Sequence, residues 1–174
     1  FEFFPLTAGD PAVLVAETTG SGNIRLQHRL KPGSSGFQDA KLVGFFGYDQ
    51  AGLPVVVKVA RYPAADVEQL LDNERHGSAY SRWGRGQGFQ WVSRPYVPGI
   101  SLERAAREPD FRGTLPTLTK LLLRQIATVH KSGRYHGDIK PQNAIVVGSQ
   151  DNQSTVLIEA PPPAEDGTAV LPPL

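Results

Sequence analysis

One short stretch of the chain, HGDIKPQN from His136 to Asn143, holds three side chains that suit phosphoryl transfer. Such a transfer needs a positive group on the nucleotide phosphates, oxygen ligands for magnesium and a carboxylate that orients the attacking hydroxyl. Asp138 is the candidate base, Lys140 would neutralise charge on the transferred group, and Asn143 would bind magnesium through its amide oxygen. The competing interpretation is an ordinary surface turn. A long apolar helical pattern before the stretch and two short strand patterns after it argue against that interpretation.

Two charged residues earlier in the chain stand in apolar surroundings. Lys58 lies inside the valine-rich run PVVVKVA, and Glu74 falls on the apolar stripe of the helical pattern that follows. A lysine inside a buried strand is costly unless an anion faces its ammonium group, so the two residues make sense as a pair. The alternative for Lys58 is the solvent side of the strand with the valines inward. The alternative for Glu74 is that it lies at the edge of the apolar stripe of its helix. The sequence alone leaves the alternatives for Lys58 and for Glu74 open.

The periodicity of the chain predicts the elements that position these residues. Strands are predicted over residues 24–30, 37–48, 54–60 and 89–97, with a hairpin of two short strands over 144–147 and 155–158. Helices are predicted over 64–83, over 101–108 with Ser101 as N-cap, and over 114–131. The run GRGQG at 84–88 is expected to end the first helix. The predicted fold class is α+β, with a small antiparallel N-terminal sheet, one helix beside it and a reduced, mostly helical C-terminal part.

The bulk properties are those of one soluble globular domain. The chain has 174 residues, of which 40% are hydrophobic and 20% charged, and its formal net charge is +1. We expect no nucleic-acid partner, because excess positive charge is missing, and no membrane span, because no apolar run approaches ~20 residues. The absence of cysteine excludes disulfides and thiolate chemistry and is compatible with a reducing compartment, so a cytoplasmic location is expected. A first residue of Phe1 and the absence of methionine indicate a trimmed or processed start.

From its N-terminal strands to about Ile158 the chain resembles the eukaryotic-type protein kinases. VVVKVAR is similar to that family's strand with the phosphate-binding lysine, NERHG to the helix with its glutamate partner, PYVPGISLE to the hinge between lobes, and HGDIKPQN to the catalytic loop. The resemblance implies one bilobal kinase-like domain over 1–174 that binds ATP with magnesium and phosphorylates Ser or Thr of a protein substrate. Its expected parts are an N-terminal arm or extra strand (1–22), an N-lobe (23–97), a reduced C-lobe (98–160) and a Pro-rich tail (161–174).

The resemblance also assigns further nucleotide contacts. Backbone groups of Tyr96 and Val97 would hold the adenine, and Gly33 and Gly36 would belong to the loop that covers the phosphates. That loop, KPGSSGFQDA, departs from the family's pattern because serine and glutamine stand at expected glycine positions. A plain hairpin turn would look the same.

A further departure concerns the metal site. The run STVLIEAPPP aligns with the family's hairpin that ends in Asp-Phe-Gly, which puts Glu159 at the metal-binding aspartate and Pro161 at the glycine. Glutamate keeps the carboxylate, but its extra methylene displaces the oxygens, and magnesium requires near-octahedral geometry at about 2.0–2.1 Å. Manganese is therefore a second candidate ion.

Two other functions stay open. Gly137 stands where most family members carry arginine, and the chain ends where the substrate-binding helices of the larger lobe should begin. These departures are compatible with a pseudokinase that binds nucleotide or regulates a partner protein. The letters HGD also resemble small-molecule phosphotransferases, whereas the following pair Lys140-Pro141 is typical of protein kinases.

Overall fold

The structure, a computed structural model, describes residues 2–15, 22–31, 42–61, 82–131, 139–148 and 153–158. The chain divides into two compact units, Phe1–Tyr96 and Val97–Leu174. Each unit has its own hydrophobic core and its own sheet.

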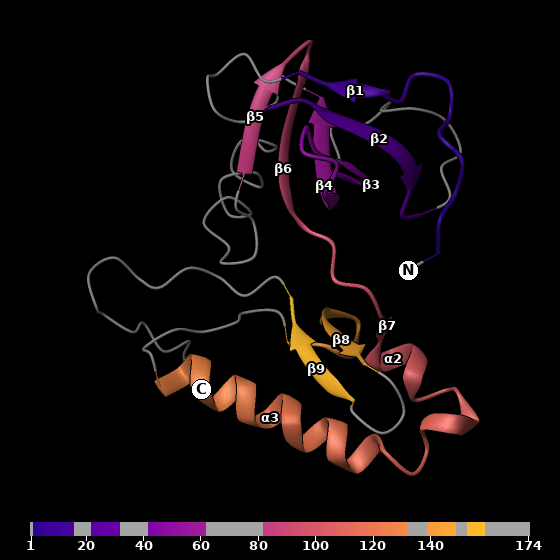
Figure 1. Cartoon of the computed structure of the whole chain (residues 1–174), viewed down its shortest axis with the longest axis vertical. Coiled ribbons are helices and arrows are strands. Elements are labelled where there is room, and N and C mark those ends of the chain that lie inside the picture. Colours follow the sequence, from indigo (N-terminus) through magenta and orange to yellow (C-terminus); the bar gives the residue numbers. More distant parts are fainter. Residues whose placement is uncertain are drawn as a thin grey trace. The chain divides into compact units, whose positions relative to one another are not determined.

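The first unit is built on a six-stranded antiparallel sheet in the order β1-β2-β3-β4-β6-β5 (Figure 1). Its strands are β1 (Val13–Leu14), β2 (Ile24–Arg29), β3 (Val43–Tyr48), β4 (Pro54–Arg61), β5 (Arg82–Gly86) and β6 (Phe89–Pro95). The sheet curves into a nearly closed, barrel-like form. Its core consists of Leu14, Ile24, Leu26, Phe45, Val55, Val57, Val59 and Trp91.

Strand β4 is buried on both of its faces. Its core-facing valines alternate with Val56, Lys58 and Ala60, which lie on the opposite side of the sheet, called here the second face. Val56 is 3% exposed and Ala60 is fully buried. A strand with nearly continuous β-branched residues is typical of one that is covered on both sides, and Lys58 interrupts this apolar run.

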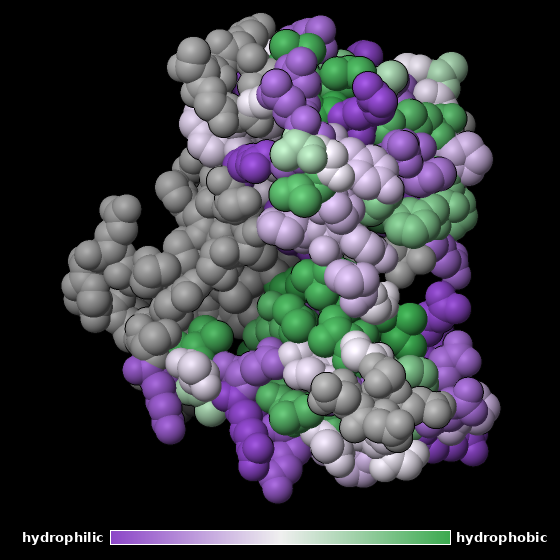
Figure 2. Space-filling view, viewed as in Figure 1, coloured by the Kyte–Doolittle hydropathy of each residue, from purple (hydrophilic) through white to green (hydrophobic). Residues whose placement is uncertain are grey.

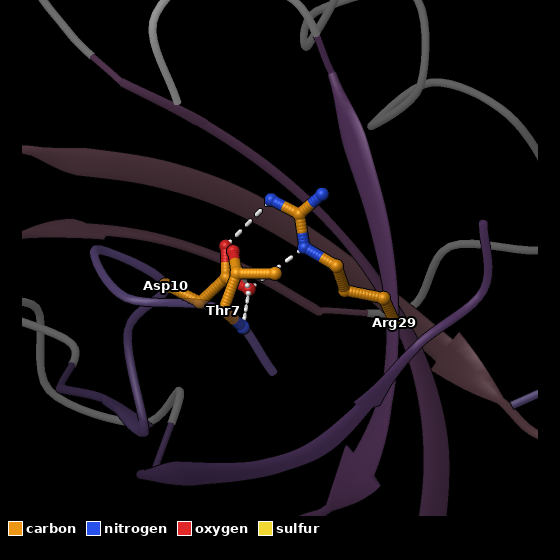
Figure 3. Close-up of polar contacts among 3 residues, drawn as sticks. All are labelled: Thr7, Asp10 and Arg29. Atoms are coloured by element: carbon orange, nitrogen blue, oxygen red, sulfur yellow. Dashed lines mark hydrogen bonds and ion pairs between the residues drawn. The ribbon is translucent and has the colours of Figure 1, made fainter. Parts of the chain in front are cut away.

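The N-terminal arm is fastened to β2 by a buried ion pair (Figure 3). The guanidinium of Arg29 donates from Nε and Nη2 to the two carboxylate oxygens of Asp10, each at 2.7 Å. Thr7 donates to the same carboxylate from its backbone N–H and its hydroxyl. Burial raises the pKa of Asp10, but the hydrogen bonds from Arg29 and Thr7 outweigh burial and hold that pKa below its usual value. Phe4 and Arg29 also exchange two backbone hydrogen bonds of 2.9 and 3.0 Å.

The second unit pairs one long helix with a three-stranded antiparallel sheet (Figure 1). Its elements are β7 (Ile100–Ser101), α2 (Leu102–Ala105), the 3₁₀ turn η1 (Pro109–Phe111), α3 (Leu115–Lys131), the 3₁₀ turn η2 (Pro141–Asn143), β8 (Ala144–Val147) and β9 (Ser154–Leu157). The core is formed by Leu102, Ala105, Leu118, Leu122, Ala144 and Val146. Hydrophilic side chains gather along the outer side of α3 (Figure 2). Within the described residues, no helix is both long and apolar enough to cross a bilayer.

A glutamine side chain joins α3 to the outer edge of β9. The amide nitrogen of Gln125 donates to the carbonyl oxygen of Thr155, and the backbone N–H of Leu157 donates to Gln125 Oε1 at 3.0 Å. Gln125 therefore satisfies backbone groups that would pair with another strand if the sheet continued.

Most of the predicted elements lie where the sequence placed them. The predictions for 24–30, 54–60, 89–97, 101–108, 114–131 and the hairpin 144–158 correspond to β2, β4, β6, α2, α3 and the pair β8–β9. Ser101 caps α2 as predicted, because its Oγ accepts from Arg104 N at 3.2 Å. The strand predicted over 37–48 is described only from residue 42. The helix predicted over 64–83 lies outside the described residues except for Arg82 and Trp83, which belong to strand β5.

The predicted fold class was wrong. We expected an α+β kinase-like arrangement with a small N-terminal sheet and a mostly helical C-terminal lobe. Instead, 41% of the described residues lie in strands, one long helix is present among them, and the six-stranded sheet nearly closes into a barrel. The second unit also carries a sheet, partly because Ile100–Ser101 pairs with β8. A two-residue strand has no period that a sequence can reveal.

Gly84 explains why β5 was missed. Glycine is uncommon inside strands because it brings no side chain to pack, so GRGQG was interpreted as a helix break. At Gly84 an added Cβ would lie 2.4 Å from Cζ2 of Trp91. Glycine therefore lets the Trp91 ring approach the backbone of β5, and Gln87 and Gly88, both with positive φ, form the turn into β6.

Candidate functional site

Lys58 occupies the middle of β4, between Gly44 on β3 and Val92 on β6. Val55, Val57 and Val59 point into the core, and Lys58 lies on the opposite face with Val56. That face is not open to solvent beside Lys58, since Val56 and Ala60 are buried and Lys58 itself is partly buried. A cation in such a place favours an anionic group nearby.

The second face can be followed from Lys58 in rows of residues that pair across the strands. Directly paired residues point to the same side of an antiparallel sheet, and successive rows lie about 7 Å apart. The first row is Gly44, Lys58 and Val92, and the second is Phe46, Val56 and Arg94. Tyr48 pairs with Pro54 in the third row, where the N–H of Tyr96 donates to the Pro54 carbonyl at 3.0 Å.

Beside the third row lies a cluster of aromatic rings, called here the aromatic cluster, which consists of Phe3, His28, Phe46 and Tyr96. The Tyr96 ring lies 5.2 Å from the ring of Phe46, and the Phe3 ring lies 4.9 Å from Phe46 and 5.4 Å from His28 between centroids. The backbone N–H of Tyr96 is already bonded to Pro54, and the adenine contact expected from the backbone groups of Tyr96 stays a prediction. Sequence reasoning missed Phe3, His28 and Phe46. The only local signal was the concentration of aromatic residues in FEFF and GFFGY.

Arg94 is a second buried cation on this face, one row from Lys58. It is 3% exposed, and its Nη1 donates to the carbonyl oxygen of Pro95 at 3.2 Å. Its Nε has no hydrogen-bond partner within the described part of the chain. A buried guanidinium adds positive potential beside Lys58. Sequence reasoning missed Arg94 because strand period alone does not show which neighbours a side chain meets.

In the second unit, Lys140 and Asn143 meet at the turn η2. Lys140 is exposed and its carbonyl oxygen accepts from the Asn143 N–H at 2.9 Å. Asn143 is 5% exposed, and its own carbonyl oxygen accepts from Ile158 N at 2.8 Å. The turn is therefore tied to Ile158, the residue that follows β9. Val97, the other predicted adenine contact, is partly buried at the start of this unit.

The other predicted site residues lie outside the described residues: Gly33, Gly36, Glu74, Asp138 and Glu159. The Lys58–Glu74 pair, the base, the phosphate-covering loop and the second metal ligand therefore stay predictions. Within the described ranges, no group of three or more His, Cys, Asp or Glu side chains could hold a metal ion. Asn143 and Glu159 would supply an amide and a carboxylate oxygen, which are ligands that suit magnesium.

The chain is similar in sequence to part of a known protein. No protein-family model matches the chain. The probable serine/threonine-protein kinase PkwA of Thermomonospora curvata is 31% identical over 156 residues, which cover 82% of this chain and 19% of that protein. The chain therefore spans about a fifth of the length of this relative, and over most of its own length it is similar in sequence to part of a kinase.

Proposed function

We propose that the chain binds ATP with magnesium and transfers the γ-phosphoryl group to a Ser or Thr hydroxyl of a protein substrate. The observation that carries this proposal is the sequence similarity, over 82% of the chain, to a probable serine/threonine-protein kinase. The residue types at Asp138, Lys140 and Asn143 support it independently, because they are the groups that such a transfer requires.

On this proposal, the second face of the first unit would supply the positive charge that a polyphosphate needs. Lys58 would contact the phosphates, with Glu74 orienting its ammonium group. Arg94, one row away, raises the potential of the same face. Cationic groups that are already held on one face favour the binding of an anion there.

The catalytic roles fall on the HGDIKPQN stretch. Asp138 would accept the proton of the attacking hydroxyl, and Lys140, which is exposed directly before η2, would neutralise charge on the group in transfer. Asn143 and Glu159 would hold the metal ion, and the chemistry that the ion supplies is neutralisation of the phosphate oxygens.

A regulatory module without transfer is the second candidate. The sequence favours it through Glu-Ala-Pro at 159–161, where the resembling family has Asp-Phe-Gly. The backbone N–H of Tyr96, which lies where adenine contacts are expected, donates to Pro54, and this favours the regulatory module as well. Such a module would bind a partner protein and keep nucleotide binding at most.

Nucleotide binding is tested by the melting temperature of the full chain with and without ATP and magnesium. A ligand that binds only the folded state adds about 2.7 kcal/mol of stability at a hundred times its dissociation constant. We expect ATP to raise the melting temperature of the wild type, and Lys58→Met to remove most of that rise. Lys120→Met, at an exposed position on α3, is the matched control. An undiminished rise in Lys58→Met would remove Lys58 from the nucleotide site.

Transfer is tested with radiolabelled ATP and generic protein substrates. Asp138→Asn should bind ATP nearly as well as the wild type and lose transfer, because the base acts on the acceptor and not on the nucleotide. Equal labelling by both proteins would trace the activity to a contaminant or to another base. ATP binding without transfer by the wild type would favour the regulatory module.

A further inference from the structure

The aromatic cluster on the second face contains one residue from outside the sheet. Phe46, His28 and Tyr96 belong to β3, β2 and the end of β6, whereas Phe3 comes from the N-terminal arm. Phe46 is 8% exposed and Phe3 is 44% exposed. Phe3 therefore lies at the outer side of the cluster and covers Phe46.

The arm fixes the backbone of Phe3 but does not prevent its ring from rotating. The adjacent residue, Phe4, exchanges two backbone hydrogen bonds with Arg29, and the same arginine is paired with Asp10. The Phe3 ring can therefore leave the cluster by a change of its χ1 rotamer while the arm stays attached. Its exposed outer side means that this rotation meets little packing.

The covered ring lies where a nucleotide bound at Lys58 would extend. Phe46 and Val56 form the row next to Lys58, about 7 Å along the strands. A nucleotide with its phosphates at Lys58 and its base directed toward Tyr96 would lay the base over the row that holds Phe46 and Val56. That surface is the one against which the Phe3 ring packs, at 4.9 Å between ring centroids.

We propose that Phe3 is an internal plug, whose ring takes the stacking place of the nucleotide base and must rotate out before nucleotide binds. The inference rests on the proposed nucleotide binding. A phenyl ring and a base are alternative stacking partners for Phe46 and Tyr96, since both present a flat π face. The arm thereby sets the apparent affinity of the site without altering any group that contacts the phosphates.

The size of the effect follows from the population of the unplugged state. Apparent affinity falls by the fraction of molecules in which the site is open. The stacking energy of a single aromatic pair makes the closed form, in which the Phe3 ring covers Phe46, about two- to tenfold more populated than the open form. The open fraction is then about a third to an eleventh, and removing the ring should tighten ATP binding by about three- to elevenfold.

The experiment is a calorimetric titration of ATP with magnesium into the full chain as wild type, Phe3→Ala, Phe3→Trp and Leu123→Ala. We expect tighter binding by Phe3→Ala and weaker binding by Phe3→Trp, whose larger ring stacks more strongly. Leu123→Ala removes a similarly exposed apolar side chain from α3 and should bind as the wild type does. In NMR spectra, ATP should move the His28 ring signals of the wild type toward their positions in nucleotide-free Phe3→Ala.

Each outcome separates the plug from the proposed function. Equal or weaker ATP binding by Phe3→Ala overturns the plug and leaves nucleotide binding standing. Absence of ATP binding by every version, Phe3→Ala included, overturns both. If Phe3→Ala melts too low to titrate, Phe3→Trp decides alone: weaker binding supports the plug, and unchanged or tighter binding overturns it.

Discussion

Asp49 organises the turn between β3 and β4 through a single carboxylate. Its Oδ1 accepts from the backbone N–H groups of Ala51 and Leu53 at 2.9 and 2.8 Å, and its Oδ2 accepts from Arg82 Nη1 at 2.8 Å. The residue is 7% exposed although it lies in a turn. The hydrogen bond from the Leu53 N–H, helped by Arg82 and opposed by burial, holds the pKa of Asp49 below its usual value.

The lowered pKa makes the stability of the first unit depend on pH. Because the folded pKa of Asp49 lies below the unfolded one, the ionised carboxylate stabilises the fold above about pH 4, and this contribution is lost as the pH falls through the folded value. Asp49→Asn should lower the free energy of unfolding by about 1 kcal/mol at neutral pH, since charge-assisted hydrogen bonds become neutral ones. The difference from the wild type should shrink in melts recorded below about pH 4.

The control for this prediction is Asp110→Asn, because Asp110 is exposed in η1. That variant should match the wild type at each pH. A deficit of Asp49→Asn that stays constant from neutral to acid pH would contradict the role assigned to the Asp49 charge.

At the scale of single residues, the sequence predicted the features that depend on residues close by in the chain. The mid-strand place of Lys58 followed from the valines on either side, and Lys140 and Asn143 were placed together by their spacing of three. Phe3 and Arg94 were not recognised, because their meaning comes from residues distant in sequence, such as Phe46 beneath Phe3. A local pattern contains no information about such contacts.

At the scale of elements, a strong hydrophobic period was sufficient to predict a helix or strand, and a weak period was not. The stripe of α3 and the valines of β4 predicted both elements, since Leu118 and the inward valines are buried as the periods require. Strand β5 was missed because Gly84 lowers the strand propensity of its own segment. The glycine is there because the Trp91 ring packs closely against it. The closure of the barrel was missed because curvature arises where strands pack, for example at the register shift between Leu26 and His28.

Gln125 provides a prediction at this scale. Gln125→Ala would leave the Leu157 N–H and the Thr155 carbonyl without their side-chain partner, at a cost of about 1–3 kcal/mol. Hydrogen exchange at the Leu157 amide should become faster. Gln125→Glu keeps an acceptor for Leu157 and should preserve much of its protection.

The exposed neighbour Arg124 supplies the control for the Gln125 variants. Arg124→Ala should change neither the stability nor the exchange of Leu157. If Leu157 exchanges equally fast in Gln125→Ala and the wild type, α3 does not hold the edge of β9.

At the scale of the molecule, the residues proposed for phosphoryl transfer are divided between the two units. Lys58 belongs to Phe1–Tyr96, whereas Lys140 and Asn143 belong to Val97–Leu174. The similarity to PkwA covers 82% of the chain, a larger share than either unit alone. Sequence similarity therefore extends into both units.

Metal dependence is the prediction that belongs to this scale. Glu159 lies outside the described residues, and its assignment as a metal ligand comes from the sequence. If the assignment is correct, Glu159→Asp brings the carboxylate oxygens back by one methylene and should tighten magnesium-dependent ATP binding and raise any rate of transfer. Manganese should partly restore the unmutated protein, because it accepts the same oxygen ligands with less strict geometry.

Titration of ATP with magnesium, manganese or a chelator, for both versions of the full chain, measures this dependence. A purely structural Glu159, paired for instance with a nearby cation, predicts a different result: Glu159→Asp would then lower the melting temperature and leave the metal dependence as it was. Chelator should abolish the difference between the two versions if the carboxylate acts only through the ion, since neither side chain then has a metal to bind. Identical responses of the two versions to all three conditions would remove Glu159 from the metal site and leave Asn143 as its remaining candidate ligand.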